Sequence, residues 1–347
     1  MSAAAHSDAI SESGRRKGRA LNFASAWAFY VATVWLHLGT GITNGDANLP
    51  ASFYAFTRYA LGFAVFGTAF ACSAYLARRA ENDSRSNDAS DPGRSGRLHA
   101  RRFLIARGLF NLMALLCFYQ SVAAGATGTA NVLNMTYPAF VAMLAGPLLG
   151  ERPDRRTLQL VTLAVSGVLL LIFVVPEQNL AGGAAGLSLP GGFALRQPGA
   201  ADLWGIASGL AAGFAIVSLR GAARVAGPIE ILCWMFGIGT LALLPVHLGD
   251  AWQLMVAPGD LPREVWFVLG SASCGILGQW TLSISYRYLD APTGSVISAS
   301  RIPIALFMGA LFLGETLGLA AWLGAGLILL SNLLLARQKT KGATKGR

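Results

Sequence analysis

Two stretches of the sequence decide the fold, because they resemble each other. The first is ATGTANVLNMTYPAFVAMLAGPLLGE, residues 126–151, and the second is APTGSVISASRIPIALFMGALFLGE, residues 291–315. Each is an apolar run with an internal proline, Pro138 or Pro303, and each ends in Leu-Gly-Glu. The likeness continues into the next apolar run, where Gly167 matches Gly326. Self-similarity over such a distance predicts a chain made of two related halves.

The composition around these stretches is that of a membrane protein. Hydrophobic residues make up 54% of the 347 residues and charged residues only 13%, whereas soluble domains carry about 25% charged residues. The four cysteines all fall inside apolar runs and show no spacing typical of a metal site or redox pair. This composition argues against a soluble enzyme and against a disordered chain.

Ten apolar runs are long enough to cross a bilayer, which takes roughly 20 residues as a helix. The sequence therefore predicts an all-α polytopic membrane protein with five helices in each half. Because five is odd, the second half must cross the membrane in the opposite sense, as an inverted repeat. The predicted spans are 21–40, 51–77, 103–124, 128–149, 157–175, 202–220, 228–248, 264–288, 292–313 and 316–336.

The remaining segments are polar tails and two long connections. The connection 78–102 is polar and without apolar periodicity, so we expect a flexible cytoplasmic loop. The connection 176–201 is rich in Gly and Pro and is expected to be a flexible external linker. The predicted organisation is an N-tail at 1–20, a first repeat at 21–175, the linker 176–201, a second repeat at 202–336 and a basic C-tail at 337–347.

The basic residues predict the orientation. If the spans alternate and both termini are cytoplasmic, 22 of the 27 Lys and Arg residues face the cytoplasm. The external side then holds two, Arg196 and Arg263, and the spans hold Arg58, Arg107 and Arg301. This asymmetry follows the positive-inside rule. The net charge of +10 is thus explained by topology, and no nucleic-acid partner is expected.

The duplicated small-residue run, mid-helix proline, Leu-Gly-Glu ending and glycine-containing following helix resemble the EamA-type family of the drug/metabolite transporter superfamily. The resemblance covers residues 21–336. It implies a ten-helix secondary carrier of small metabolites, often an exporter, with no ATPase and no cofactor of its own. It also implies a multi-pass protein of a bacterial cytoplasmic (inner) membrane. The resemblance leaves the substrate open.

Three residues in the duplicated spans are the first candidates for function. Pro138 and Pro303 each remove a backbone hydrogen bond, so they mark either breaks beside a central cavity or packing kinks. Arg301 lies mid-span, where an arginine costs at least ~2.5 kcal/mol and must face the interior. It is expected either to bind an anionic group of the substrate, such as a carboxylate, or to brace another helix.

Other polar and aromatic residues within the spans are candidates for the walls of a substrate site, because small-molecule pockets combine aromatic walls with few polar groups. Each alone is more often an interhelical hydrogen bond or a packing residue. Arg58 and Arg107 are expected to be structural. The further candidates for substrate binding are Gln120, Asn134, Tyr137, Gln279 and Trp280.

Two features at helix ends and faces favour structural roles. Glu151 and Glu315 end matching spans and are expected to cap the helix that follows each of them. Gly205, Gly209 and Gly213 form one small face, which predicts close packing within the chain, with a homodimer interface as the alternative.

The sequence leaves two alternatives to a transporter, a membrane-embedded enzyme and a non-transporting sensor or scaffold. A membrane-embedded enzyme normally shows clustered His, Asp or Glu residues. The four histidines share no motif, and no nucleotide-binding loop, zinc spacing or nucleophile elbow is present, so no metal is expected. A non-transporting sensor or scaffold is the other alternative, and the duplicated proline-broken spans argue against it.

Overall fold

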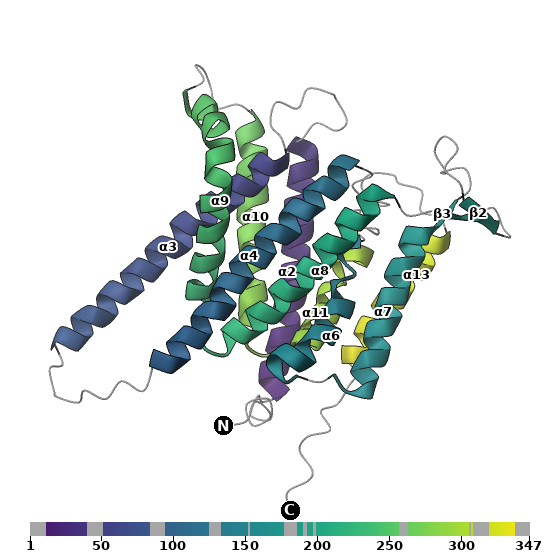
Figure 1. Cartoon of the computed structure of the whole chain (residues 1–347), viewed down its shortest axis with the longest axis horizontal. Helices are drawn as coiled ribbons and strands as arrows, with labels where there is room; N and C mark the ends of the chain where they lie inside the picture. Colours follow the sequence, from purple (N-terminus) through teal and green to yellow (C-terminus); the bar gives the residue numbers. More distant parts are fainter. Residues whose placement is uncertain are drawn as a thin grey trace, which may run out of the picture.

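The structure is a computed structural model, shown in Figure 1. It describes residues 12–39, 51–83, 94–124, 133–151, 153–176, 186–189, 193–196, 199–256, 263–304, 307 and 319–336. The first half of the chain contains α2 (Glu12–Gly39), α3 (Ala51–Asp83), α4 (Arg94–Ala124), α6 (Tyr137–Leu149) and α7 (Arg155–Phe173). The second half contains α8 (Ala200–Ala223), α9 (Pro228–Val256), α10 (Arg263–Ser285), α11 (Ala291–Ser298) and α13 (Leu319–Ala336).

Several helices extend beyond the predicted spans. Helix α2 begins at Glu12, inside the predicted N-tail. The predicted flexible loop 78–102 is wrong in most of its length, since α3 continues to Asp83 and α4 begins at Arg94. Polar residues can prolong an apolar helix outside the bilayer because water satisfies their side chains while the backbone hydrogen bonds continue. Residues 84–93 lie outside the described part of the chain.

The predicted external linker contains a small sheet that the sequence analysis did not anticipate. Strands β1 (Val174–Pro176), β2 (Gly186–Leu189) and β3 (Phe193–Arg196) are antiparallel in the order β1-β3-β2. In the register, Val174 pairs with Leu195 and Gly186 pairs with Arg196. The sheet lies at the end of the bundle opposite to the start of α2 and the end of α13 (Figure 1).

The two duplicated stretches are both broken helices. Leu133 and Asn134 form a short helical piece, residues 135–136 form a turn, and α6 then starts with Pro138 in its first turn. A proline is tolerated there because the first amides of a helix have no intrahelical acceptor. Likewise α11 ends at a turn of residues 299–300, and residues 301–304 resume a helix that contains Pro303. The remainder of the predicted span 292–313 lies outside the described residues, except residue 307.

Helix contacts between the halves follow one pattern. Helix α4 packs on α8, and correspondingly α10 packs on α2. Helix α4 also packs on α9, as α10 packs on α3, while α6 contacts α8 as α11 contacts α2. The pairs α3 with α9, α7 with α13 and α6 with α11 complete the set. If α2, α3, α4, α6 and α7 are exchanged with α8, α9, α10, α11 and α13 in that order, each of these helix contacts becomes itself or another contact of the set.

The outer faces of the helices are apolar, as a bilayer requires. Large hydrophobic side chains such as Met143, Leu203 and Leu241 are more than two-thirds exposed. Within the described residues, four segments are long and apolar enough to cross a membrane: Ser52–Ala77, Ala200–Ala223, Pro228–Trp252 and Val265–Ser285. The chain is therefore a multi-pass, predominantly helical membrane protein.

Candidate functional site

Glycines on α8 set the position of the first broken helix. A Cβ atom on Gly209 would lie 2.6 Å from Thr136 Oγ1, and one on Gly213 would lie 2.8 Å from Phe140 Cβ. A Cβ on Gly205 would lie 2.7 Å from Leu133. The glycine face thus packs against residues 133–140, which confirms the prediction of close packing within the chain. A homodimer would need another face.

Arg301 lies just after the turn that breaks the second duplicated helix. Its guanidinium carbon is 4.4 Å from the centre of the Phe29 ring on α2, a cation–π contact between the halves. Its Nε atom is buried and has no hydrogen-bond partner among the described residues. The predicted interior orientation of Arg301 therefore agrees with the structure, and no carboxylate is described as its partner.

A second arginine is buried nearby. Arg107 on α4 is 2% exposed and donates a hydrogen bond of 2.8 Å from Nη2 to Oε1 of Gln279 on α10. Its Nε atom also lacks a partner among the described residues. Tyr59 on α3 is buried close to it and accepts a hydrogen bond from Asn111. Helices from both halves enclose the Arg107 side chain, so it does not extend to the membrane surface.

Two buried tyrosines connect these arginines. Tyr286 is within electrostatic reach of Arg107, Arg301 and Tyr137, and Arg301 is also within reach of Arg58. The hydroxyl groups of Tyr137 and Tyr286 are buried and make no hydrogen bond of good geometry among the described residues, although both lie near Ser298 and that of Tyr137 also lies near Arg301. We call Arg58, Arg107, Arg301, Tyr59, Tyr137 and Tyr286 the arginine cluster. It combines cationic and hydroxyl donors, several of them unpartnered, between the two halves.

The other predicted site residues divide into two groups. Gln279 joins the arginine cluster through Arg107, whereas Asn134 donates a hydrogen bond of 2.6 Å to Ser208 on α8. Trp280 stacks on Phe66 with ring centres 5.3 Å apart, in a groove between α3 and α10. Gln120 is exposed on α4. The structure thus brings Arg301, Tyr137 and Gln279 together and leaves Asn134, Trp280 and Gln120 in other surroundings.

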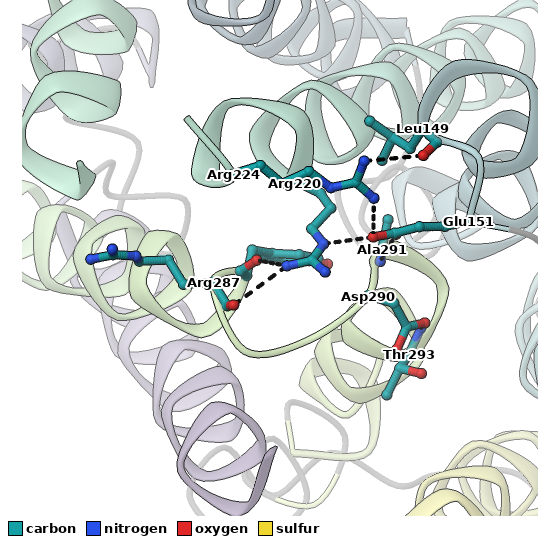
Figure 2. A network of polar contacts seen from close by, with 9 residues as sticks. Leu149, Glu151, Arg220, Arg224, Arg287, Asp290, Ala291 and Thr293 are labelled. Atoms are coloured by element: carbon teal, nitrogen blue, oxygen red, sulfur yellow. Dashed lines mark hydrogen bonds and ion pairs between the residues drawn. The ribbon is translucent and has the colours of Figure 1, made fainter. Parts of the chain in front are cut away.

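A polar network links the two halves at one end of the bundle (Figure 2). The Glu151 carboxylate accepts hydrogen bonds from Arg220 Nε at 2.8 Å, Arg224 Nη2 at 2.5 Å and the Ala291 amide at 3.0 Å. Arg220 also donates to the carbonyl of Tyr286, and Arg224 to that of Leu149. We call Glu151 with Arg220, Arg224 and the Ala291 amide the Glu151 latch. Glu151 belongs to the first half, and its three partners belong to the second.

The Leu-Gly-Glu motif explains how Glu151 reaches across. Gly150 has φ 69°, a left-handed conformation that favours glycine, and its amide bonds to carbonyls at the end of α6. This turn directs Glu151 toward α8. The prediction that Glu151 caps the following helix is wrong: Asp154 caps α7 by accepting from the Thr157 amide at 2.8 Å, and Glu151 binds the first amide of α11 instead. Glu315 lies outside the described residues.

The pKa values of two neighbouring carboxylates at this end are shifted in opposite directions. Burial alone would raise the pKa of Glu151, but the charge of Arg220 and hydrogen bonds from Ala291, Arg220 and Arg224 outweigh burial and hold this pKa below its ordinary value. The pKa of Asp290 is raised, chiefly by burial and further by the charge of Glu151, against the hydrogen bond from Thr293. Glu151 is therefore held as a charged partner of the latch.

A neutral polar contact joins the halves near the latch. Asn22 on α2 is fully buried, donates to the Gly294 carbonyl at 3.2 Å and accepts from Ser298 Oγ at 2.7 Å. The sequence analysis missed Asn22 and also the role of Arg220, which resembled a cytoplasmic loop arginine. Only their burial, which depends on distant segments, distinguishes them. Among the residues that the structure describes, no group of three His, Cys, Asp or Glu residues could hold a metal ion.

An apolar-faced helical bundle with arginines buried between its halves defines a multi-pass membrane protein with a polar interior. The chain belongs to the EamA-like transporter family, which matches residues 22–173 and 199–337. The expected family resemblance is thereby confirmed. Transport across a membrane is the activity common to this family and to the relatives described next.

Similar proteins agree with this assignment. An uncharacterized transporter of Helicobacter pylori is 29% identical, over 65% of this chain and 70% of that protein. The pseudopaline exporter CntI of Pseudomonas aeruginosa is 25% identical, over 68% of this chain and 75% of that protein. A protein of known crystal structure shares the fold with a TM-score of 0.56 at 15% identity, covering 92% of this chain and 96% of the other.

Proposed function

We propose that this chain is a secondary transporter that exports a small metabolite across a bacterial inner membrane by alternating access. The substrate binds between the halves at the arginine cluster, and the halves rock to expose it to either side. Membership of a transporter family and similarity to an exporter support transport. The observation that carries the site is Arg301, a partly buried arginine whose Nε atom is enclosed between the halves and which has no carboxylate partner among the described residues.

The proposed architecture is an inverted repeat of five helices each. It is supported by the duplicated sequence stretches and by helix contacts that are preserved when the halves are exchanged. The equivalent breaks before Pro138 and Pro303 are its hinges and free backbone groups beside the site. The basic residues support cytoplasmic termini, which assigns the Glu151 latch to the cytoplasmic end.

The roles within the site follow from the contacts. Arg301 anchors an anionic group of the substrate, such as a carboxylate, because its planar guanidinium can donate two parallel hydrogen bonds. Tyr137 supplies a hydroxyl without a partner, and Gln279 orients Arg107. Asn134, Gln120 and Trp280 act outside this anchor, through packing or along the path of the substrate.

The Glu151 latch supports the alternating-access mechanism. All three partners of its carboxylate belong to the opposite half, so rocking of the halves has to break these contacts. A latch that is strong yet breakable keeps one end closed until substrate binding favours the other state. In this mechanism the latch is the cytoplasmic gate.

The test is metabolite profiling of the medium from cells that produce the wild type, Arg301→Gln, Arg287→Gln or no transporter. Arg287 is an exposed arginine of the same half, and its substitution removes the same charge. All variants must reach the membrane at equal levels. We expect carboxylate-bearing compounds to accumulate with the wild type and Arg287→Gln and not with Arg301→Gln. Equal profiles for the wild type and empty cells would contradict export, and an unchanged Arg301→Gln profile would contradict the anchor.

A further inference from the structure

The arginines in the middle of the bundle have no described carboxylate that balances their positive charge. Arg58, Arg107 and Arg301 lie close enough together to influence one another directly or through the tyrosines. Within a low-dielectric interior, like charges repel and each needs an anion nearby. Among the described residues, no carboxylate acts on Arg107 or Arg301. Glu151 is engaged by the latch, and Asp290 accepts from the Thr293 amide at 3.0 Å. The described residues therefore supply no anion to the cluster.

The unmet donors fall into two groups on opposite halves. Arg107 stands on α4 of the first half, with only the neutral oxygen of Gln279 as its described hydrogen-bond acceptor. Arg301 stands on the second half, over the face of the Phe29 ring. The Nε atoms of both are buried and unpartnered among the described residues. A buried donor without a partner is destabilising, so both positions favour an acceptor from a ligand.

Tyr286 lies within electrostatic reach of both Arg107 and Arg301. It is fully buried, interacts with the charges of both arginines, and its hydroxyl, which lies near Ser298, makes no hydrogen bond of good geometry among the described residues. The Tyr286 ring packs directly over Gly294, where a Cβ atom would lie 2.6 Å from the ring. The absence of a side chain at Gly294 therefore allows the ring to pack there. A ligand at this site would be within reach of both guanidinium groups and of the Tyr286 hydroxyl.

We infer that the substrate carries two anionic groups, one bound by Arg301 and the other by Arg107, as in a dicarboxylate. This inference rests on the proposed function and defines the substrate class of the same site. Two anionic groups supply an acceptor to each unmet guanidinium, whereas a single carboxylate leaves one without an anion. Binding also joins the halves, because Arg107 and Arg301 belong to different ones. Gln279 is a positioning residue, which holds Arg107 toward the site through Nη2.

The experiment measures thermal stabilisation of the purified, detergent-solubilised protein by linear dicarboxylates of increasing chain length. The half-amide of each dicarboxylate is the matched probe, since it has the same length and one charge fewer. We expect at least one dicarboxylate to raise Tm, and its half-amide to bind about tenfold more weakly or worse. Equal binding of the diacid and its half-amide, or no stabilisation by any diacid, would overturn the inference.

Variants of Arg107 and Arg301 test whether each arginine binds one anionic group of the substrate. Arg107→Gln and Arg301→Gln should each bind the diacid and the half-amide equally, while Arg287→Gln should retain the preference for the diacid. Arg107→Lys keeps a charge and should retain the preference with weaker binding, and loss of the preference in this variant would contradict the charge argument. If the Gln variants aggregate, the wild-type comparison still decides. Export in the profiling experiment is measured separately, so a transporter that prefers monoanions would fail only this inference.

Discussion

The Glu151 carboxylate lies 2.8 Å from Arg220 Nε, although the two residues belong to different halves of the chain and are 69 positions apart. Arg220 is almost fully buried, with its side chain 3% exposed, and the Glu151 side chain is 11% exposed. Arg224 and the Ala291 amide bind the same carboxylate, so one acidic residue of the first half joins two segments of the second half, the end of α8 and the start of α11 (Figure 2).

Removing the Glu151 carboxylate should destabilise the protein strongly. Glu151→Ala leaves two arginines and one amide without their acceptor, and breaking a buried ion pair from one side costs about 3–5 kcal/mol. Glu151→Gln keeps one acceptor oxygen and should lose less. Thermal unfolding in detergent measures both. The matched control is Glu12→Gln, which removes an exposed ion pair with Arg16 and should leave Tm nearly unchanged. Equal Tm values for Glu151→Ala and the wild type would contradict the latch.

The pH dependence of stability should separate Glu151 from Asp290. The folded pKa of Glu151 is lowered, so its contribution is complete above the ordinary glutamate pKa and is lost as pH falls through the folded value. The Tm difference between the wild type and Glu151→Gln should therefore stay constant at neutral pH and shrink only below about pH 4. A difference that already disappears near neutral pH would show that Glu151 is protonated there.

Asp290 should behave in the opposite way. Its folded pKa is raised, so the protonated form is favoured and its contribution is lost as pH rises through that value. Asp290→Asn removes this titration and keeps a good helix cap for α11, since Asn and Asp cap about equally well. We expect the Tm of Asp290→Asn relative to the wild type to increase with pH across the mildly acidic range. If the Tm values of Asp290→Asn and of the wild type changed with pH in parallel, this would contradict the raised pKa of Asp290.

The sequence predicted the parts of the fold that local patterns encode. The apolar runs predicted the helices, and the duplicated prolines marked helix breaks that occur two to four residues earlier, at 135–136 and 299–300. The partners of the buried charges were not predictable in this way. Arg107 meets Gln279 across 172 positions, and Glu151 meets Ala291 across 140. Such pairs depend on how the halves pack, which no local pattern records.

Two glycines that match in the repeat should respond differently to substitution. A Cβ atom on Gly167 in α7 would lie 2.6 Å from the Gly324 carbonyl oxygen of α13, whereas one on Gly326 would meet nothing within 4 Å. Gly326→Ala should stabilise by up to about 1 kcal/mol, because alanine favours helix. Gly167→Ala forces α7 and α13 apart and should destabilise by about 1–3 kcal/mol. Thermal unfolding compares them, and equal effects would contradict the close packing of α7 on α13.

Opening of the latch should expose the closed end of the bundle to solvent. Ser295 on α11 is fully buried close to Ala291, and its hydroxyl donates only to the Pro292 carbonyl among the described contacts. Ser295→Cys, in a background without the four natural cysteines, provides a reporter of accessibility. In inside-out vesicles, a membrane-impermeant maleimide should label this cysteine slowly, and adding Glu151→Gln should accelerate labelling several-fold. Adding Glu12→Gln instead should leave the labelling rate unchanged. Because labelling requires an open end, an unchanged rate in Glu151→Gln would mean that contacts such as those of Asn22, and not the latch, keep this end closed.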